Sequence, residues 1–116
     1  MIQPGEVYLA DFGPAGPHPV IVVSREELNR GRYALVVVCT SARFVTRSKL
    51  SNCVLFQAGD FGFTVDCVAQ CENMLSIDLV QLDLAAGPMG VLDDTALGNV
   101  IKAIGYVIRG SSVRHA

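Results

Sequence analysis

The sequence predicts a mainly β fold with one α-helix at its C-terminal end, built as a single domain over residues 1–116. Two observations predict it. The first two thirds of the chain hold short apolar runs separated by turns that contain Gly or Pro, which is typical of antiparallel strands. The last part carries apolar residues at helical spacing. We expect a small, bent, SH3-like antiparallel β-barrel, because closing a short sheet removes its exposed edges.

The first two strands flank a turn rich in Gly and Pro. Polar and apolar residues alternate over Glu6–Phe12, which places Val7, Leu9 and Asp11 on one side of a strand. After the turn, Val20–Ser24 is a continuous apolar run with β-branched residues, as expected for a strand that is covered on both faces.

A third strand is expected at Ala34–Cys39, another continuous apolar run. The residues before it, Arg25–Asn29, are compatible with one helical turn. Ser24 would cap that turn, because serine is among the preferred N-cap residues.

The second half of the chain predicts two more short strands, Cys53–Gln57 and Cys67–Cys71, joined by the loop Ala58–Thr64. The segment Met74–Leu84 is more ambiguous. It is compatible with a strand followed by a short helical turn.

The last element is an amphipathic helix. Asp93 or Asp94 can cap its start, and Gly110 is well placed to end it. Gly98 and Gly105 lie seven residues apart within it, which predicts close packing against the sheet or another helix. Its apolar positions follow a period near 3.6 residues: Leu97, Val100, Ile101, Ile104, Val107 and Ile108.

Composition narrows the class of protein. No run of 18 apolar residues and no basic-then-apolar leader occur, so we expect a cytoplasmic protein without a membrane span. The cysteines show neither a CxxC pair nor a histidine at zinc spacing, so we expect reduced core thiols, no metal and no cofactor. We expect residues 111–116 to fray. The cysteines are Cys39, Cys53, Cys67 and Cys71.

The basic residues are unevenly placed. Six of the nine lie between positions 25 and 49, whereas seven of the eleven acidic residues lie beyond position 59. A local basic patch can hold a polyanion although the net charge is −2. A solvated loop region with scattered charge explains the pattern equally well. The candidates for RNA binding are Arg25, Arg43, Arg47 and Lys49.

Three residues are candidates for catalysis: His18, Thr40 and Ser41. Pro19 restricts the backbone of His18 to extended geometry, and an imidazole can transfer protons near neutral pH. Thr40 and Ser41 place two hydroxyls at the end of an apolar run. Cleavage of an RNA phosphodiester without a metal needs a base for the 2′-hydroxyl and donors for the charge on the phosphate. These residue types fit that chemistry.

Each candidate also has a purely structural explanation. A histidine between prolines is often a surface residue, and a Thr-Ser pair often caps a turn through side-chain-to-backbone hydrogen bonds. Basic residues on a hairpin can simply protect a sheet edge.

The order of motifs resembles the MazF/PemK family of toxins from toxin–antitoxin pairs. Pro4–Phe12 is similar to the opening strand of that family, and His18–Ser24, with Asn29 beyond, is similar to its second strand and turn. Val36–Ser41 resembles its third strand with the Thr-Ser end. Glu72–Asp78 resembles a diverged form of its fourth motif. The resemblance covers nearly the whole chain.

The resemblance implies a two-fold dimer that cuts single-stranded RNA at short sequences without a metal and leaves a cyclic phosphate. The site would lie near the dimer groove, where the tail of an antitoxin blocks it. Thr40 stands at the position of the catalytic threonine or serine. His18 stands where the family usually has an arginine, Leu75 replaces a basic residue, and the loop Gly13–Pro17 is shorter than in most members.

The leading hypothesis is an endoribonuclease toxin in which His18 supplies the base. Because the usual arginine is replaced, a weak or inactive relative that binds RNA or an antitoxin remains an alternative. A relative that poisons DNA gyrase is a second alternative. It is disfavoured because the chain contains no tryptophan as an aromatic anchor near its end.

Overall fold

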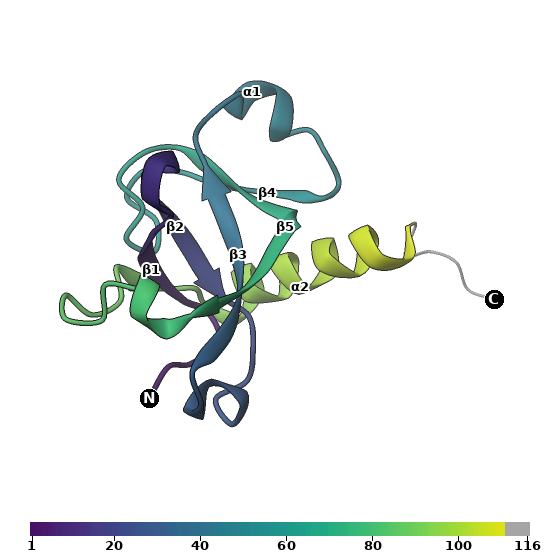
Figure 1. The fold of residues 1–116 in the computed structure, drawn as a ribbon. Helices are drawn as coiled ribbons and strands as arrows, with labels where there is room; N and C mark the ends of the chain where they lie inside the picture. The colour runs from purple at the N-terminus through teal and green to yellow at the C-terminus, as the bar shows by residue number, and fades with distance from the viewer. Residues whose placement is uncertain (111–116) are drawn as a thin grey trace.

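Six antiparallel strands form one curled sheet in the order β4–β5–β3–β2–β1–β6, and a long helix packs on it (Figure 1). The computed structural model describes residues 1–110, so the expectation for residues 111–116 lies outside the described part. The strands are β1 (Glu6–Asp11), β2 (Pro17–Val22), β3 (Tyr33–Thr40), β4 (Cys53–Phe56), β5 (Cys67–Asp78) and β6 (Gly90–Val91). The helices are α1 (Phe44–Arg47) and α2 (Asp94–Arg109), with 3-10 turns η1 (Gly13–Ala15), η2 (Leu28–Arg30) and η3 (Leu79–Gln81).

The predicted fold class, mainly β with a C-terminal helix, is confirmed. The sheet curls into a half-barrel, and within residues 1–110 no pairing joins β4 to β6. These two strands therefore remain as edges. The helix α2 packs against β4 and β5.

Each face of the sheet carries its own apolar core. Ile21 and Val37 face the core that α2 covers, whereas Val20 and Val38 face the second core on the other side. Because β2 and β3 are buried on both faces, their sequences are continuous apolar runs, as predicted. Full burial of one such side chain stabilises the fold by about 1.5–3 kcal/mol.

The strand β1 differs from its prediction in which side is buried. Val7 is fully buried, but Leu9 and Asp11 on the same side are exposed. Tyr8 and Ala10, on the opposite side, are buried in the second core. The alternation was identified correctly, but the curl of the sheet covers the side that holds Tyr8 and Ala10 more completely.

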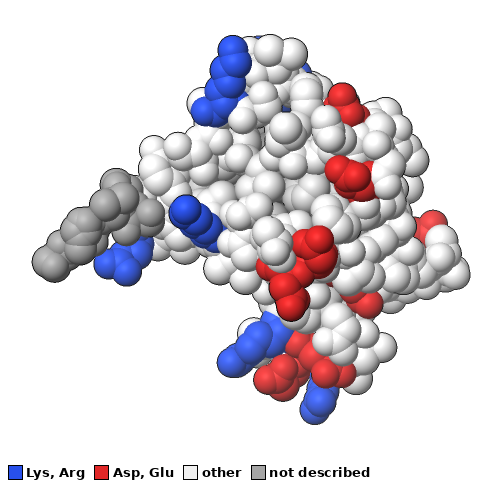
Figure 2. Space-filling view, turned by 180° about the vertical axis from the view of Figure 1, so that it is seen from behind, with Lys and Arg blue, Asp and Glu red and all other residues white. Residues whose placement is uncertain are grey.

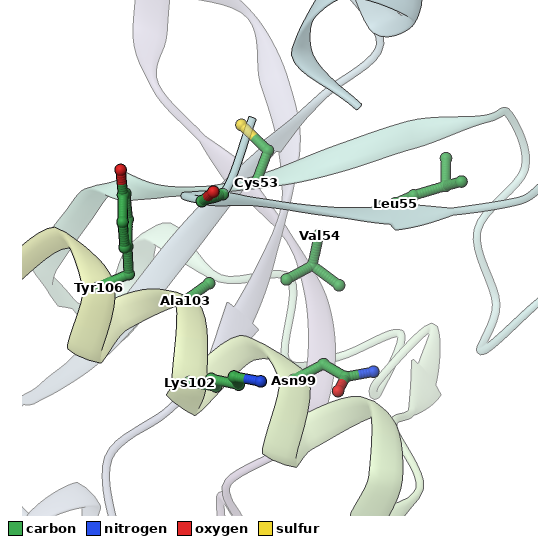
Figure 3. A pocket seen from close by; sticks show the side chains of 8 residues that line it. Cys53, Val54, Leu55, Asn99, Lys102, Ala103 and Tyr106 are labelled. Carbon is green, nitrogen blue, oxygen red and sulfur yellow. The ribbon is translucent and has the colours of Figure 1, made fainter. Parts of the chain in front are cut away.

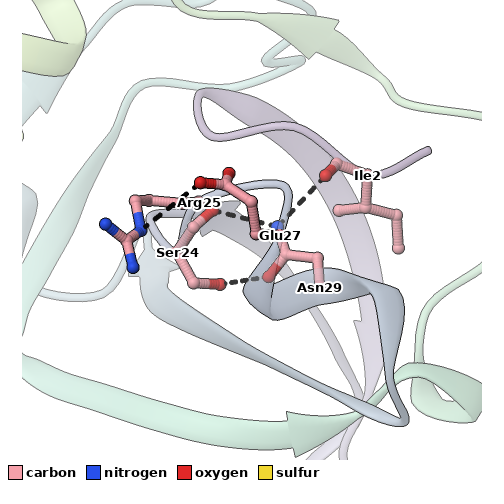
Figure 4. Close-up of polar contacts among 5 residues, drawn as sticks. All are labelled: Ile2, Ser24, Arg25, Glu27 and Asn29. Atoms are coloured by element: carbon pink, nitrogen blue, oxygen red, sulfur yellow. Dashed lines mark hydrogen bonds and ion pairs between the residues drawn. The ribbon is translucent and has the colours of Figure 1, made fainter.

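The connection between β2 and β3 is held by buried polar groups rather than by a helix cap at Ser24 (Figure 4). The helical turn is η2, further along the chain than predicted. The side-chain amide nitrogen of Asn29 donates to the carbonyl oxygens of Ile2 at 3.1 Å and Ser24 at 2.9 Å. The Ser24 hydroxyl donates to the Asn29 amide oxygen and accepts from the Leu35 backbone N–H at 2.9 Å. The predicted cap is therefore wrong, because these partners occupy the Ser24 hydroxyl.

The strand β5 is longer than the predicted Cys67–Cys71 and contains a bulge. Val37 pairs with Met74, but the next residue, Val38, pairs with Gln70. Three residues of β5 (71–73) therefore have no partners on β3, and such insertions bend a strand and redirect its side chains. The strand then continues to Asp78 and is followed by the 3-10 turn η3. This agrees with the strand and short helical turn that the sequence predicted within Met74–Leu84.

The boundaries of α2 agree with the prediction. The Asp93 carboxylate accepts a hydrogen bond from the Ala96 backbone at 2.8 Å, and the Gly110 N–H bonds the Tyr106 carbonyl at 2.7 Å. The predicted close packing at Gly98 and Gly105 is wrong, because a Cβ at either position would meet nothing within 4 Å. Within residues 1–110, no helix combines the length and apolarity that crossing a bilayer requires.

The four cysteines are unpaired and buried, as predicted. Burial raises the pKa of the Cys71 thiol to about 12. Since the thiolate is the reactive form, this side chain serves as an apolar core residue at neutral pH.

Candidate active site

The pairing of β2 with β3 brings the two main sequence candidates to the same place. Val22 pairs with Val36, and Val20 pairs with Val38. Continuing this antiparallel register by two residues places His18 opposite Thr40, on the same face of the sheet. Their separation of 22 residues in the sequence thus becomes adjacency at one end of the strand pair.

A pocket of about 240 Å³ lies at this end of the sheet, and both His18 and Thr40 line it. The β1–β2 connection and the bulged part of β5 complete the wall. The full lining consists of Phe12, Ala15, His18, Val38, Thr40, Gln70, Asn73 and Leu75.

The position of His18 is fixed by the strand and by the turn before it. His18 is the second residue of β2 and pairs with Ala10 of β1. The turn is closed by hydrogen bonds from the Gly13 N–H to the Asp11 carboxylate at 2.8 Å and from the Gly16 N–H to the Gly13 carbonyl at 2.9 Å. The Phe12 ring centre lies 6.0 Å from that of the imidazole. The half-buried imidazole is therefore held at the pocket.

Thr40 combines a structural contact with a free donor. Its hydroxyl oxygen accepts a hydrogen bond from the Ala42 N–H at 3.1 Å, which is the turn-capping contact that the structural explanation predicted. Within residues 1–110 its O–H has no acceptor, so it can donate to a ligand. Ser41 is exposed and is not part of the pocket lining. The structure thus brings together His18 and Thr40 but not Ser41.

Sequence reasoning assigned no role to Phe12, Gln70 and Asn73, which also line the pocket. Gln70 reaches it because the bulge of β5 pairs Gln70 with Val38, and Asn73 is the last residue of that bulge. A signal was present in the sequence: Glu72 and Asn73 interrupt two apolar runs. A polar interruption of this kind within a strand pattern is typical of a bulge, and bulges are frequent beside active sites.

Three of the four basic candidates lie in the segment that directly follows Thr40. Arg43, Arg47 and Lys49 are in or beside α1, and Arg47 donates to the Ala42 carbonyl at 3.2 Å. In the described part of the chain, none of the three has an acidic partner within 4.0 Å. Figure 2 shows basic side chains projecting at the α1 end of the molecule, whereas the opposite end carries both basic and acidic side chains. Arg43, Arg47 and Lys49 do not line the pocket itself.

Arg25 is the basic candidate that the structure separates from the pocket. It lies beyond the far end of β2, where it forms an exposed ion pair with Glu27 at 4.0 Å. From His18 to Val22 alone the strand spans roughly 13 Å. A basic residue close in sequence is thus distant in space, because an extended strand separates its two ends.

A larger groove of about 570 Å³ lies between β4 and α2 (Figure 3). Val54 points from the strand toward the helix, where Asn99, Lys102 and Tyr106 line the opposite wall. It contains no histidine, and burial raises the pKa of its thiol, Cys53. The groove lacks a base that works near neutral pH, so the smaller pocket is the better active-site candidate. Among residues 1–110, no group of three or more His, Cys, Asp and Glu side chains could hold a metal ion.

The structure is thus a curled antiparallel half-barrel with a packed C-terminal helix and with a pocket at one end that His18 and Thr40 line. Residues 3–108 match the family model of PemK-like, MazF-like toxins of type II toxin–antitoxin systems. The chain belongs to this family.

Solved structures share the fold at low sequence identity. A mycobacterial endoribonuclease in complex with its cognate antitoxin has a TM-score of 0.76 at 16% identity, covering 93% of this chain and 95% of that one. The Mycobacterium tuberculosis toxin MazF-mt6 has a TM-score of 0.74 at 19% identity, covering 89% of this chain and 95% of that one. A MazE–MazF structure from Deinococcus radiodurans has a TM-score of 0.72 at 17% identity, covering 95% of this chain and 97% of that one. No curated protein sequence matches the chain significantly.

Proposed function

We propose that the protein is the toxin of a toxin–antitoxin pair and acts in the cytoplasm as a metal-independent endoribonuclease on single-stranded RNA with short target sequences. The observation that carries the proposal is the pocket that His18 and Thr40 share, in a chain of this toxin family. The comparison with an endoribonuclease bound to its cognate antitoxin supports both the activity and the partner.

The proposed reaction uses the ribose 2′-hydroxyl as the nucleophile. His18 takes the proton from this hydroxyl, whose oxygen then forms a bond to the phosphorus. The bond from phosphorus to the 5′ oxygen breaks, and that oxygen takes a proton from water. The products are a 2′,3′-cyclic phosphate and a 5′-hydroxyl.

The charge that grows on the phosphate needs donors that are already in place. The Thr40 O–H is free to donate toward the pocket, and a fixed donor of this kind stabilises a transition state more than water does. Arg43, Arg47 and Lys49 would hold the neighbouring phosphates of the strand, since they have no acidic partners in the described residues.

The test is incubation of the purified protein with a defined long RNA in EDTA, with mapping of the cuts and of their end groups. We expect cuts at a short recurring sequence with cyclic phosphate ends. The double variant His18→Ala/Thr40→Ala, purified in the same way, controls for contaminating nuclease. Thr64→Ala, at an exposed loop threonine that does not line the pocket, is the matched control with full activity. Cuts of equal rate in the double variant would refute the proposal.

A binding role without turnover is the second candidate function. It is favoured by one observation, the presence of His18 and Leu75 at positions where the family usually has basic residues. Salt-dependent RNA binding with no cleavage would identify it, because phosphate contacts weaken as salt rises.

We further propose that the protein is a homodimer whose copies meet over α2 and the open edge of β4. The end of α2 exposes Tyr106 and Ile108, with Ile108 68% exposed, and Leu55 on β4 is 46% exposed. Exposed apolar surface beside an unpaired strand edge is typical of an interface. We expect light scattering to give the dimer mass for the wild type and the monomer mass for Ile108→Lys. A monomeric wild type at micromolar concentration would contradict this.

A further inference from the structure

One polar side chain in the pocket has no task in the fold or in the proposed reaction. Asn73 is half-buried and lines the pocket, yet within residues 1–110 its side-chain amide takes part in no hydrogen bond. The neighbouring polar residues differ in this respect. Asn52 donates to the Glu72 carboxylate at 2.7 Å, and Gln70 contacts the same carboxylate at 3.5 Å.

Asn73 lies at the pocket within a local irregularity of the backbone. It is the last of the three residues in β5 that the pairing with β3 skips, directly before the pair Val37–Met74. A regular continuation of the ladder from Val37–Met74 would pair Asn73 with Val38, which itself lines the pocket. The bulge leaves Asn73 without a partner on β3 and pairs Gln70 with Val38, so it adds Gln70 to the wall where Asn73 lies.

The other walls of the pocket suit a flat, partly apolar group. Phe12 presents an aromatic ring beside the imidazole, and Leu75 contributes an aliphatic side that is 37% exposed. Single-stranded RNA is recognised by stacking of its bases on aromatic side chains and by hydrogen bonds to the base edges. An amide carries one acceptor and two donors, so it can pair with both groups of a base edge.

We propose that Asn73 and Phe12 form a subsite for one nucleobase beside the scissile phosphate, in which Asn73 reads the base edge and Phe12 supports its face. This inference rests on the proposed function, since it concerns the same pocket. It assigns the choice of the base at one position of the target sequence to Asn73.

The first test maps cuts in a random-sequence RNA pool in EDTA. The wild type is expected to prefer one base at one fixed position relative to the cut. Asn73→Ala is expected to lower that preference about 5- to 150-fold, the range measured for a good bidentate contact between a side chain and a base, while preferences at other positions persist. Gln57→Ala removes an exposed amide outside the pocket and is the matched control with an unchanged profile.

Two further variants separate base reading from a structural role. Asn73→Asp replaces the amide donors with a second acceptor, so the preferred base at that position should change to one that presents an amino group. Phe12→Leu keeps an apolar side chain but removes the ring. It should lower the cleavage rate at low RNA concentration and leave the preferred sequence intact.

The second test does not depend on cleavage. Thr40→Ala, with and without Asn73→Ala, is used to select bound RNA from the same pool. Enrichment of one base that disappears with Asn73→Ala supports the subsite even if the wild type does not cut RNA. An unchanged profile in Asn73→Ala, in either test, would overturn the inference but leave the proposed function standing. Absence of both cutting and RNA binding would overturn both.

Discussion

The two ends of the β2–β3 pair use polar residues in opposite ways. At one end Ser24 and Asn29 are 7% and 3% exposed, and their side-chain polar groups are hydrogen-bonded within the protein (Figure 4). At the other end His18 and Thr40 are half-buried at an open pocket. Within residues 1–110 the Thr40 hydroxyl keeps a donor without an acceptor. The first end joins the chain to its N-terminal segment, and the second leaves hydrogen-bonding capacity for a ligand.

Structural and functional polar residues differ in where their hydrogen-bond partners come from. A buried polar group that lacks a partner costs free energy, so a structural site is satisfied internally. A site for a ligand holds groups whose partners arrive with the ligand. Substitutions at the two ends should therefore affect different measurements: stability at the Ser24–Asn29 end and RNA cleavage at the His18–Thr40 end.

After the loss of the His18 imidazole, the largest expected effect is on cleavage by Thr40→Ala. Loss of one fixed donor to the transition state typically lowers the rate about 10²–10³-fold. Thr40→Ser keeps the hydroxyl and should retain most of the activity, which separates the donor from the methyl group. Single-turnover rates on one defined RNA measure both variants. Equal rates for alanine and serine at this position would contradict the role of the hydroxyl.

The next effect is on stability, through Asn29→Ala. The substitution leaves the carbonyl oxygens of Ile2 and Ser24 without their donor, which should lower the free energy of unfolding by roughly 2–3 kcal/mol. Urea denaturation measures the change, and Gln57→Ala, at an exposed amide, should change stability by less than about 0.5 kcal/mol. A loss for Asn29→Ala no larger than that of the control would show that the network does not hold this end.

A smaller effect concerns the salt dependence of RNA binding. Each phosphate contact that is lost should reduce the slope of log affinity against log salt by about 0.7 for a single strand. We expect this for Arg43→Ala, Arg47→Ala and Lys49→Ala, whereas Arg25→Ala, at the opposite end, should leave the slope unchanged. Binding titrations at several salt concentrations measure the slope for each variant. Equal slopes for all four variants would contradict the division between the two ends.

The smallest effect is a pH dependence at the structural end. The Asp78 carboxylate accepts hydrogen bonds from the Val80 N–H and the Arg32 side chain, which lowers its pKa. A lowered pKa adds stability above the ordinary range of aspartate, and this stability is lost as the pH falls through the folded-state pKa. Asp78→Asn should thus be slightly less stable near neutral pH and approach the wild type in acid. Denaturation curves at several pH values test this, and a gap that widens in acid would contradict it.

Much of the fold could be predicted from the sequence because it follows from local patterns. The continuous runs of β2 and β3 reflect burial on both faces, and the boundaries of α2 follow from Asp93 and Gly110. The cap predicted at Ser24 is wrong, because the packing of the connection gives its hydroxyl other partners, Asn29 and Leu35. The glycines of α2 signalled close packing that is absent in the described chain, since no neighbouring element covers that side.

The candidate site was predictable only in part. His18 and Thr40 were identified from residue type and from resemblance, and the register of β2 with β3 places them together. Asn73 also lines the pocket, but the polar interruption at Glu72 and Asn73 indicates only a bulge, and the pairing of β5 with β3 is needed to place Asn73 at the site. Arg25 was grouped with the other basic residues by sequence distance, which the extended strand β2 makes a poor guide to position.

The role of His18 as the base is tested by the cleavage rate of His18→Ala in EDTA, measured beside the unfolding midpoint of the same variant. We expect a loss of about 10²–10⁴ in rate, the usual contribution of a positioned acid–base group, with an unchanged unfolding midpoint. Asn29→Ala should give the reverse, a lowered midpoint with cleavage retained below it. Wild-type cleavage by a folded His18→Ala would contradict the central claim that this end of the β2–β3 pair is the active site.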